Sequence, residues 1–220
     1  MSGGWWVHEL WNAGRATELV AWIFWVLASI SLHELAHGWA ALWEGDDTPR
    51  KTGHLTANPV VHMGVPSIVV FLIIGIAWGM MPVNPYRFRH GKWGRILVSA
   101  AGPIMNLVLA FLTLTALGVV ASQAEESENV HHLMAFLFTG GFLNFVLFAF
   151  NLLPIPPLDG STILANLFPE IGKLYSKPQA PMIGLFLMFM LVMSNAGSAV
   201  FLWANNIAAA YSGFVASLLH

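Results

Sequence analysis

Two histidines and a glutamate in the first long apolar segment have the spacing of a catalytic metal site. They form the string His33-Glu34-Leu35-Ala36-His37. Residues four apart lie on one face of a helix, so both imidazoles can bind one zinc ion while Glu34 serves a zinc-activated water as general base. An ionisable side chain at hydrocarbon depth is costly and usually functional. The alternative is that the histidines pack between helices and Glu34 hydrogen-bonds to a neighbouring helix.

A third zinc ligand is required, because catalytic zinc usually has three protein ligands and one open position. The chain has no cysteine, which leaves His, Asp and Glu as candidates. We expect the ligand to be Asp159, since the other acidic residues apart from Glu34 lie at segment ends or in polar loops. Three prolines precede it and interrupt the apolar segment, so its carboxylate can project from irregular backbone that protein or a watery cavity covers. Alternatively, Asp159 caps a helix predicted for Ser161 to Leu167.

The composition places these residues in a membrane protein. Hydrophobic residues make up 57% of the 220 residues and charged residues only 9%, whereas a soluble domain has about a quarter charged residues. The formal net charge is −2 without a long basic run, which argues against a nucleic-acid partner. The first fifteen residues contain Arg15 as their one cation, so we expect no cleavable signal peptide there.

The predicted fold is an all-α polytopic membrane protein with about five to six transmembrane helices. Five apolar segments approach the length of about 20 residues that spans a bilayer, at roughly 16–43, 94–121, 133–153, 179–193 and 198–219. The short run from Pro66 to Pro82 is a possible re-entrant segment, and Thr52 to Thr56 suggests a small membrane-associated β element. We expect a single membrane-embedded domain over 1–220, with a catalytic core at about 16–168 and additional C-terminal helices at about 179–219.

The loop charges predict the orientation of the chain. The loop from Asn84 to Arg95 contains four cations, whereas Ser122 to His132 contains three glutamates and neither Lys nor Arg. By the positive-inside rule the first loop is cytoplasmic and the second lies outside. Arg50 and Lys51 precede the run from Pro66 to Pro82, so both of its flanks are predicted on the cytoplasmic side. The site would then lie towards the cytoplasmic face.

The chain resembles the site-2 protease family of intramembrane zinc metalloproteases, in its compact bacterial and archaeal branch. Three motifs in order support the resemblance over roughly residues 20 to 165: His33-Glu34-x-x-His37, Gly102-Pro103-x-x-Asn106 and Asn151-x-x-Pro154-x-x-x-Leu158-Asp159-Gly160. The resemblance implies one zinc ion held by His33, His37 and Asp159, with Glu34 as general base and Asn151 near the scissile carbonyl. Asn151 could instead form an interhelical hydrogen bond, and Asn106 is expected to support the site from behind the ligands.

The predicted function is hydrolysis of peptide bonds in or near transmembrane segments of protein substrates. The implied partners are a membrane-spanning protein substrate and the lipid bilayer, and the implied location is the cell (inner) membrane. The alternative is a metal-ion transporter or channel, because intramembrane ionisable residues also mark ion paths. A transport path would need more polar groups in series along the spans. Whether His54 and His62 reach the metal, the identity of the substrate and the oligomeric state stay open.

Overall fold

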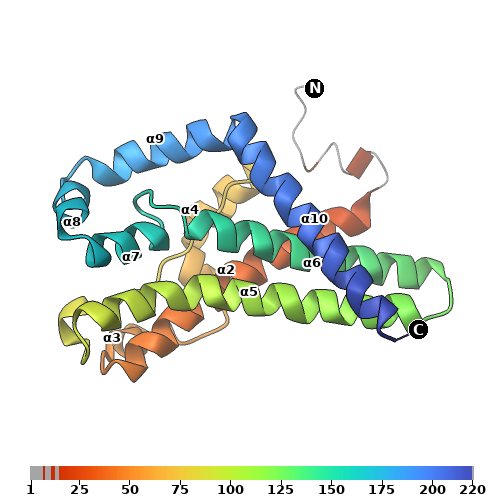
Figure 1. Cartoon of the computed structure of the whole chain (residues 1–220), viewed down its shortest axis with the longest axis horizontal. Helices are drawn as coiled ribbons and strands as arrows, with labels where there is room; N and C mark the ends of the chain where they lie inside the picture. Colours follow the sequence, from red (N-terminus) through yellow and green to blue (C-terminus); the bar gives the residue numbers. More distant parts are fainter. Residues whose placement is uncertain (1–6, 8–10, 13–14, 220) are drawn as a thin grey trace.

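The computed structural model describes residues 7, 11, 12 and 15–219, and this part of the chain is helical without a strand. Four of its helices are long and apolar enough to cross a membrane. They are α2 (Ala16–Trp43), α5 (Lys92–Gln123), α6 (Glu128–Asn151) and α10 (Asn195–Ser217). Figure 1 shows α5 and α6 lying side by side along the long axis, with α10 crossing them obliquely.

The remaining described helices are shorter, and one of them, α9, corrects the predicted number of spans. The short elements are α3 (Thr48–Lys51), α4 (Pro59–Ile74), the 3-10 turn η1 (Pro85–Arg87), α7 (Asp159–Leu167), α8 (Pro169–Tyr175) and α9 (Ala180–Val192). The prediction counted α9 as a span, but its 13 residues rise only about 20 Å against about 30 Å of hydrocarbon. The segment is limited by prolines before it and by Ser194, which caps α10. Five to six spans was therefore too many.

The predicted β element is also wrong. Thr52 follows α3, where its N–H donates to the carbonyl of Thr48 (3.0 Å), and the N–H of His54 donates to the carbonyl of Pro49 (2.9 Å). These local bonds use donors that a strand pair would need. Gly53 has a φ of 74°, a left-handed conformation that glycine adopts in turns. The segment is thus a helical turn followed by a tight bend.

Helix α5 lies at the centre of the bundle and contacts α2, α6, α7 and α10. Helix α6 packs closely on two sides because of adjacent glycines. A Cβ atom on Gly140 would collide with the indole of Trp25 in α2, and one on Gly141 would collide with Leu114 in α5. Small residues at such positions let helix backbones approach each other in a membrane. The three motif-bearing segments are thereby held side by side.

The run from Pro66 to Pro82 goes out as a helix and comes back as extended chain. Helix α4 ends at Gly75, whose left-handed φ of 81° closes the helix. The chain from Ala77 to Met81, called the return chain below, then lies against α4. The N–H of Met80 donates to the carbonyl of His62 (2.9 Å), and Ser67 Oγ bonds to the backbone of Trp78. Both ends of the run therefore lie next to each other, and Met81 lies against Gly38 of α2.

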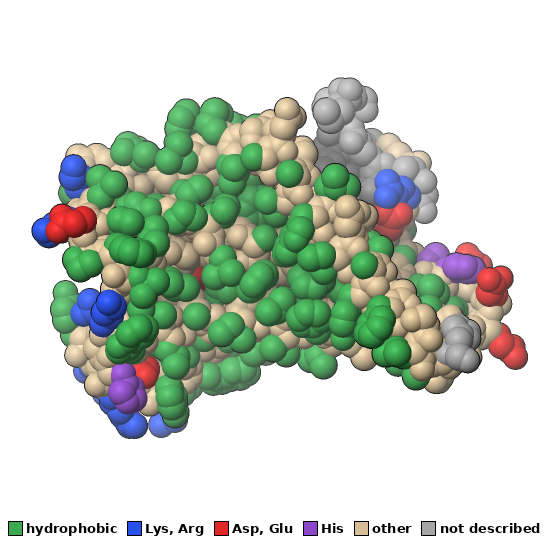
Figure 2. Space-filling view, in the orientation of Figure 1, with side chains coloured by type: hydrophobic (Ala, Val, Ile, Leu, Met, Phe, Trp, Pro, Cys, Tyr) green, Lys and Arg blue, Asp and Glu red, His purple; other side chains and the backbone are tan. Residues whose placement is uncertain are grey.

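The surface carries a broad apolar band between two charged ends, as Figure 2 shows. The basic loop before α5 and the cations around α3 and α8 lie at one end of the molecule. The connection between α5 and α6, with its glutamates, lies at the other end (Figures 1 and 2). This separation agrees with the charge pattern of the loops, and it aligns the long helices between the two ends.

Candidate metal centre

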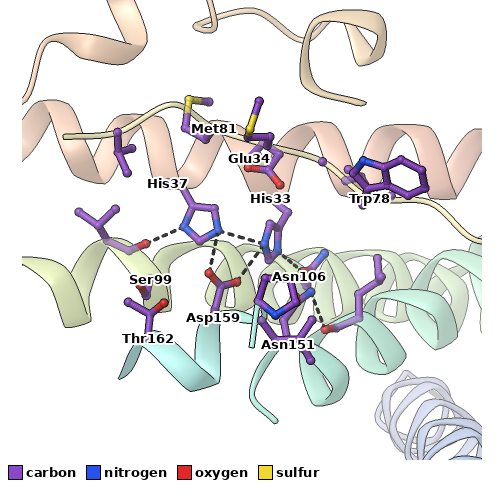
Figure 3. A pocket seen from close by; sticks show the side chains of 18 of the residues that line it. His33, Glu34, His37, Trp78, Met81, Ser99, Asn106, Asn151, Asp159 and Thr162 are labelled. Atoms are coloured by element: carbon purple, nitrogen blue, oxygen red, sulfur yellow. Dashed lines mark hydrogen bonds and ion pairs between the residues drawn. The ribbon is translucent and has the colours of Figure 1, made fainter. Parts of the chain in front are cut away.

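Three predicted ligands from two distant parts of the chain meet at one point. His33 and His37 stand one turn apart on α2, and Asp159 is the first residue of α7. The two Nε2 atoms are 3.0 Å apart, and the Asp159 carboxylate lies 3.2 Å from that of His33 and 3.4 Å from that of His37 (Figure 3). Donors about 2.0 to 2.1 Å from a tetrahedral zinc ion lie about 3.4 Å from one another. The donor set and its spacing therefore fit Zn²⁺.

The alternative role of Asp159 as a helix cap is not observed. Leu158 is the N-cap residue of α7, and no side chain forms a capping hydrogen bond there. Helix α6 ends at Asn151, and the proline-rich chain between the two helices is irregular, as the sequence predicted. A Cβ atom on Gly160 would lie 2.6 Å from the carbonyl oxygen of Leu153. Glycine therefore lets the first turn of α7 fold against the end of α6, which directs Asp159 towards α2.

A buried chain of side-chain hydrogen bonds orients His33. Its Nδ1 lies 2.6 Å from Oδ1 of Asn106 on α5. The Asn106 amide donates to Asn144 on α6 (2.9 Å), and the Asn144 amide donates to Ser29 on α2 (2.9 Å). Because Asn106 Oδ1 can only accept, His33 Nδ1 carries the proton and Nε2 keeps its lone pair for the metal.

His37 is oriented in the same way by backbone. Its Nδ1 lies 2.6 Å from the carbonyl oxygen of Val98 on α5, so this nitrogen donates and Nε2 is again free to bind metal. Both histidines are less than one-tenth exposed. Two independent acceptors on one helix thus fix the tautomer and the ring plane of both ligands.

Gly102 brings α5 directly onto the metal position. A Cβ atom there would lie 2.5 Å from His33 Nε2 and even nearer to His37 Nε2. In the sequence this glycine appears only as part of the motif Gly102-Pro103-x-x-Asn106. The structure shows that the space it leaves is the space in front of both ligand nitrogens.

Glu34 faces the extended return chain. It is 7% exposed and lines a cavity of about 470 Å³ together with the three ligands and the chain from Ala77 to Met81. A Cβ atom on Gly79 would lie 2.6 Å from Glu34 Oε1. The return chain therefore forms one wall of the site, close to the residue predicted as general base (Figure 3).

Asn151, at the end of α6, lines the same cavity. One of its amide hydrogens is used within its own helix, since Nδ2 donates to the carbonyl of Leu147 (3.1 Å). An amide has two donors, so one is left for another acceptor. The interhelical hydrogen bond considered for Asn151 is instead made by Asn144, one heptad earlier.

His54 and His62, whose roles the sequence left undecided, are not part of the ligand group. Among the described residues, the potential metal-binding group contains only His33, His37 and Asp159. His54 Nδ1 lies 3.0 Å from the carbonyl of Thr52, and His62 Nε2 lies 2.6 Å from the carbonyl of Thr56. Their observed contacts are thus with the polar segment itself, and His62 also ties that segment to the return chain.

A second set of buried acidic residues anchors the C-terminal end of α2. Glu44 accepts hydrogen bonds from His90 N (3.0 Å) and Nδ1 (2.9 Å), and Asp46 accepts one from the N–H of Asn84 (2.6 Å). Burial by itself raises the pKa of the Glu44 carboxyl, but the bonds from His90 and the nearby Arg89 outweigh it and hold the pKa below its ordinary value. The basic loop is thereby fixed to the helix that carries both histidines.

Comparisons with known proteins find zinc metalloproteases among the relatives of this chain. The family described as Peptidase family M50 matches residues 117–194, which include Asp159. A Bacillus subtilis protein named "Putative zinc metalloprotease YwhC" is 37% identical over 188 residues, which cover 81% of this chain and 82% of that protein. A Mycobacterium tuberculosis protein named "Putative zinc metalloprotease Rip2" is 31% identical over 201 residues, covering 83% and 72% of the two chains. No solved structure matches the chain significantly.

Proposed function

We propose that this chain holds its catalytic zinc through His33, His37 and Asp159. The chain belongs to peptidase family M50, the site-2 proteases, and is an intramembrane zinc metalloprotease. The observation that supports this assignment is the meeting of three donor residues, two of which, His33 and His37, bond through Nδ1 and leave Nε2 for the metal. The transporter alternative has no support, since the relatives are named as metalloproteases.

Glu34 is proposed as the general base. Zinc, when bound, polarises a peptide carbonyl and makes water a nucleophile near neutral pH. The Glu34 carboxylate stands next to the histidines in the same cavity, where it can take the proton of the attacking water and later deliver a proton to the leaving amine. Its position between the ligands and the return chain keeps that proton transfer inside a largely buried site.

Asn151 is proposed to donate its free amide hydrogen to the oxyanion that forms on the scissile carbonyl. Its amide lies on the cavity wall opposite the return chain (Figure 3). Removing a donor of this kind costs about 10² to 10³ in turnover in other enzymes. Asn151→Ala is therefore expected to keep its zinc and to lose about 10²-fold in turnover. Unchanged turnover would make Asn151 a packing residue.

The substrate is proposed to be a membrane-spanning protein that unwinds at the site, in the cell (inner) membrane. The N-terminal part of α5, with Arg95, lines the cavity, and this end of α5 lies at the same end of the molecule as α3 (Figure 1). If that end is cytoplasmic, as the positive-inside rule requires, the run from Pro66 to Pro82 is re-entrant and water reaches the site from the cytoplasm.

The decisive experiment combines zinc quantitation with cleavage of a tagged single-span substrate in detergent or proteoliposomes. Glu34→Gln should retain stoichiometric zinc and lose cleavage, because the amide cannot accept the proton. Asp159→Ala should lose zinc, because two histidines alone hold the ion weakly. Glu126→Gln, an exposed change in the α5–α6 connection, serves as the control. Stoichiometric zinc in Asp159→Ala would refute the ligand assignment.

The orientation can be tested separately, because the chain has no cysteine. Single cysteines at Thr52, Lys92 and Glu125, all exposed positions, would be labelled with a membrane-impermeant maleimide in intact cells. Labelling is expected at Glu125 and not at Thr52 or Lys92. Labelling of Thr52 from outside, with Lys92 protected, would show a true span and overturn the re-entrant arrangement.

A further inference from the structure

Arg95 connects the catalytic cavity to a second, more polar cavity. The second cavity, of about 530 Å³, lies between the start of α5 and the helices α7 and α8. It shares Arg95, Thr162, Pro85 and Pro157 with the cavity that contains the metal ligands. A substrate segment that leaves the metal towards the basic end of the molecule therefore passes the guanidinium of Arg95.

The Arg95 side chain has no anionic partner within the described part of the chain. Its Nε is buried without a hydrogen-bond partner, and its guanidinium lies over the ring of Tyr86, 5.8 Å from the ring centroid. The second cavity has no Asp or Glu in its lining. By contrast, Arg87, Lys51 and Lys173 each form an ion pair with a carboxylate.

An unpaired guanidinium in such a place favours a planar, bidentate anion. Arg has five N–H donors in a fixed fork that matches a carboxylate. Partly desolvated charge is costly without a partner, and a charge-assisted hydrogen bond is shorter and stronger than a neutral one. Arg95 lines both cavities, so an incoming carboxylate would accept hydrogen bonds from the terminal N–H groups of the guanidinium and neutralise its charge.

The position of Arg95 on α5 defines where that carboxylate would stand. Arg95 and Gly102 are seven residues apart on one face of α5, which is about 10 Å along the axis. Gly102 adjoins the metal position. An extended peptide rises about 3.3 Å per residue, so about three residues separate the scissile bond from Arg95.

We infer that Arg95 is a specificity-determining residue that binds an acidic side chain of the substrate about three residues from the scissile bond, on the side facing the basic end of the molecule. The inference rests on the proposed protease function of the neighbouring site. The ligand is an Asp or Glu carboxylate of the unwound substrate segment, held by the guanidinium fork between the two cavities.

The test is a charge-swap series on a cleavable single-span substrate whose scissile bond has been mapped. Glu, Gln and Lys are placed in turn at the second to fifth residues on that side of the bond. Wild-type enzyme should prefer Glu over Gln at about the third position by about tenfold in kcat/KM, the size expected for a charge-assisted hydrogen bond. Arg95→Gln should abolish this preference, and Arg95→Glu should prefer Lys at the same position.

Two controls separate the inference from a structural role. Lys92→Gln removes one charge from the exposed start of the same helix and should leave the substrate preference unchanged. Zinc content should be the same in Arg95→Gln as in wild type. If wild type cleaves but ignores substrate charge, or if Arg95→Gln slows Glu and Gln substrates equally, the inference is overturned. Failure of wild type to cleave any substrate, as with Glu34→Gln, would instead count against the proposed function.

Discussion

Replacing Gly102 by alanine is expected to remove zinc by filling the space in front of the ligand nitrogens. The new Cβ would lie 2.5 Å from His33 Nε2, about 1 Å inside an ordinary contact of about 3.5 Å. His33 cannot move away freely, because its other nitrogen lies 2.6 Å from Asn106. A shift of about 1 Å would stretch that bond to about 3.6 Å, where it is no longer a hydrogen bond.

The same methyl group also approaches His37 Nε2, whose ring is held by the carbonyl of Val98. Loss of one supporting bond typically costs 10- to 100-fold in metal affinity, and here two ligands are displaced. We therefore expect the zinc affinity of Gly102→Ala to fall by about 100-fold or more. Zinc would be measured by mass spectrometry of the purified protein and by competition with a chelator, and turnover should fall in parallel.

The displaced rings are expected to cost about 1 to 3 kcal/mol of stability, partly offset by the about 1 kcal/mol by which alanine favours a helix over glycine. The metal-free variant should therefore stay folded and melt within several degrees of metal-free wild type. Gly213→Ala is the matched control, because a Cβ atom there meets nothing within 4 Å. Stoichiometric zinc and normal turnover in Gly102→Ala would refute the assignment of the metal position.

Three further predictions concern the surroundings of the site. Asn106→Leu should weaken zinc binding about 10- to 100-fold, whereas Asn206→Leu on an exposed face of α10 should not; equal affinities would rule out the orienting role. Gly79→Ala places a Cβ 2.6 Å from Glu34 Oε1, so turnover should fall while zinc stays bound, and loss of zinc would contradict the placement of Gly79 beside the base. Because the pKa of Glu44 is lowered in the folded protein, its ionised carboxylate stabilises the fold at pH values above the ordinary pKa of a glutamate. This stability is lost as the pH falls through the lowered pKa. Thermal melting of wild type should therefore decline with acidification below about pH 4.5 more steeply than that of Glu44→Gln, and parallel curves would dismiss the effect.

The sequence determined those features that depend on local periodicity and segment length. The spacing of His33 and His37 placed both rings on one face of a helix, because four residues make about one turn. The extent of α2 agrees with the predicted segment, since apolar length and flanking polar residues define a span. The prolines before Asp159 likewise predicted the end of α6, because proline lacks the N–H that continues a helix.

The tertiary structure decided everything that depends on how the helices are rotated and displaced against one another. Three motifs could be expected to meet, but the sequence did not show that Asn144 and Ser29 complete the support of His33 or that Gly102 fronts the metal position. Backbone hydrogen bonds within the turn after α3 replaced the predicted β element, and the bond between Met80 and His62 fixed the return of the chain after Gly75. Such contacts join residues far apart in sequence, so no local pattern specifies them, and the unpaired guanidinium of Arg95 between two cavities became visible only in the packed bundle.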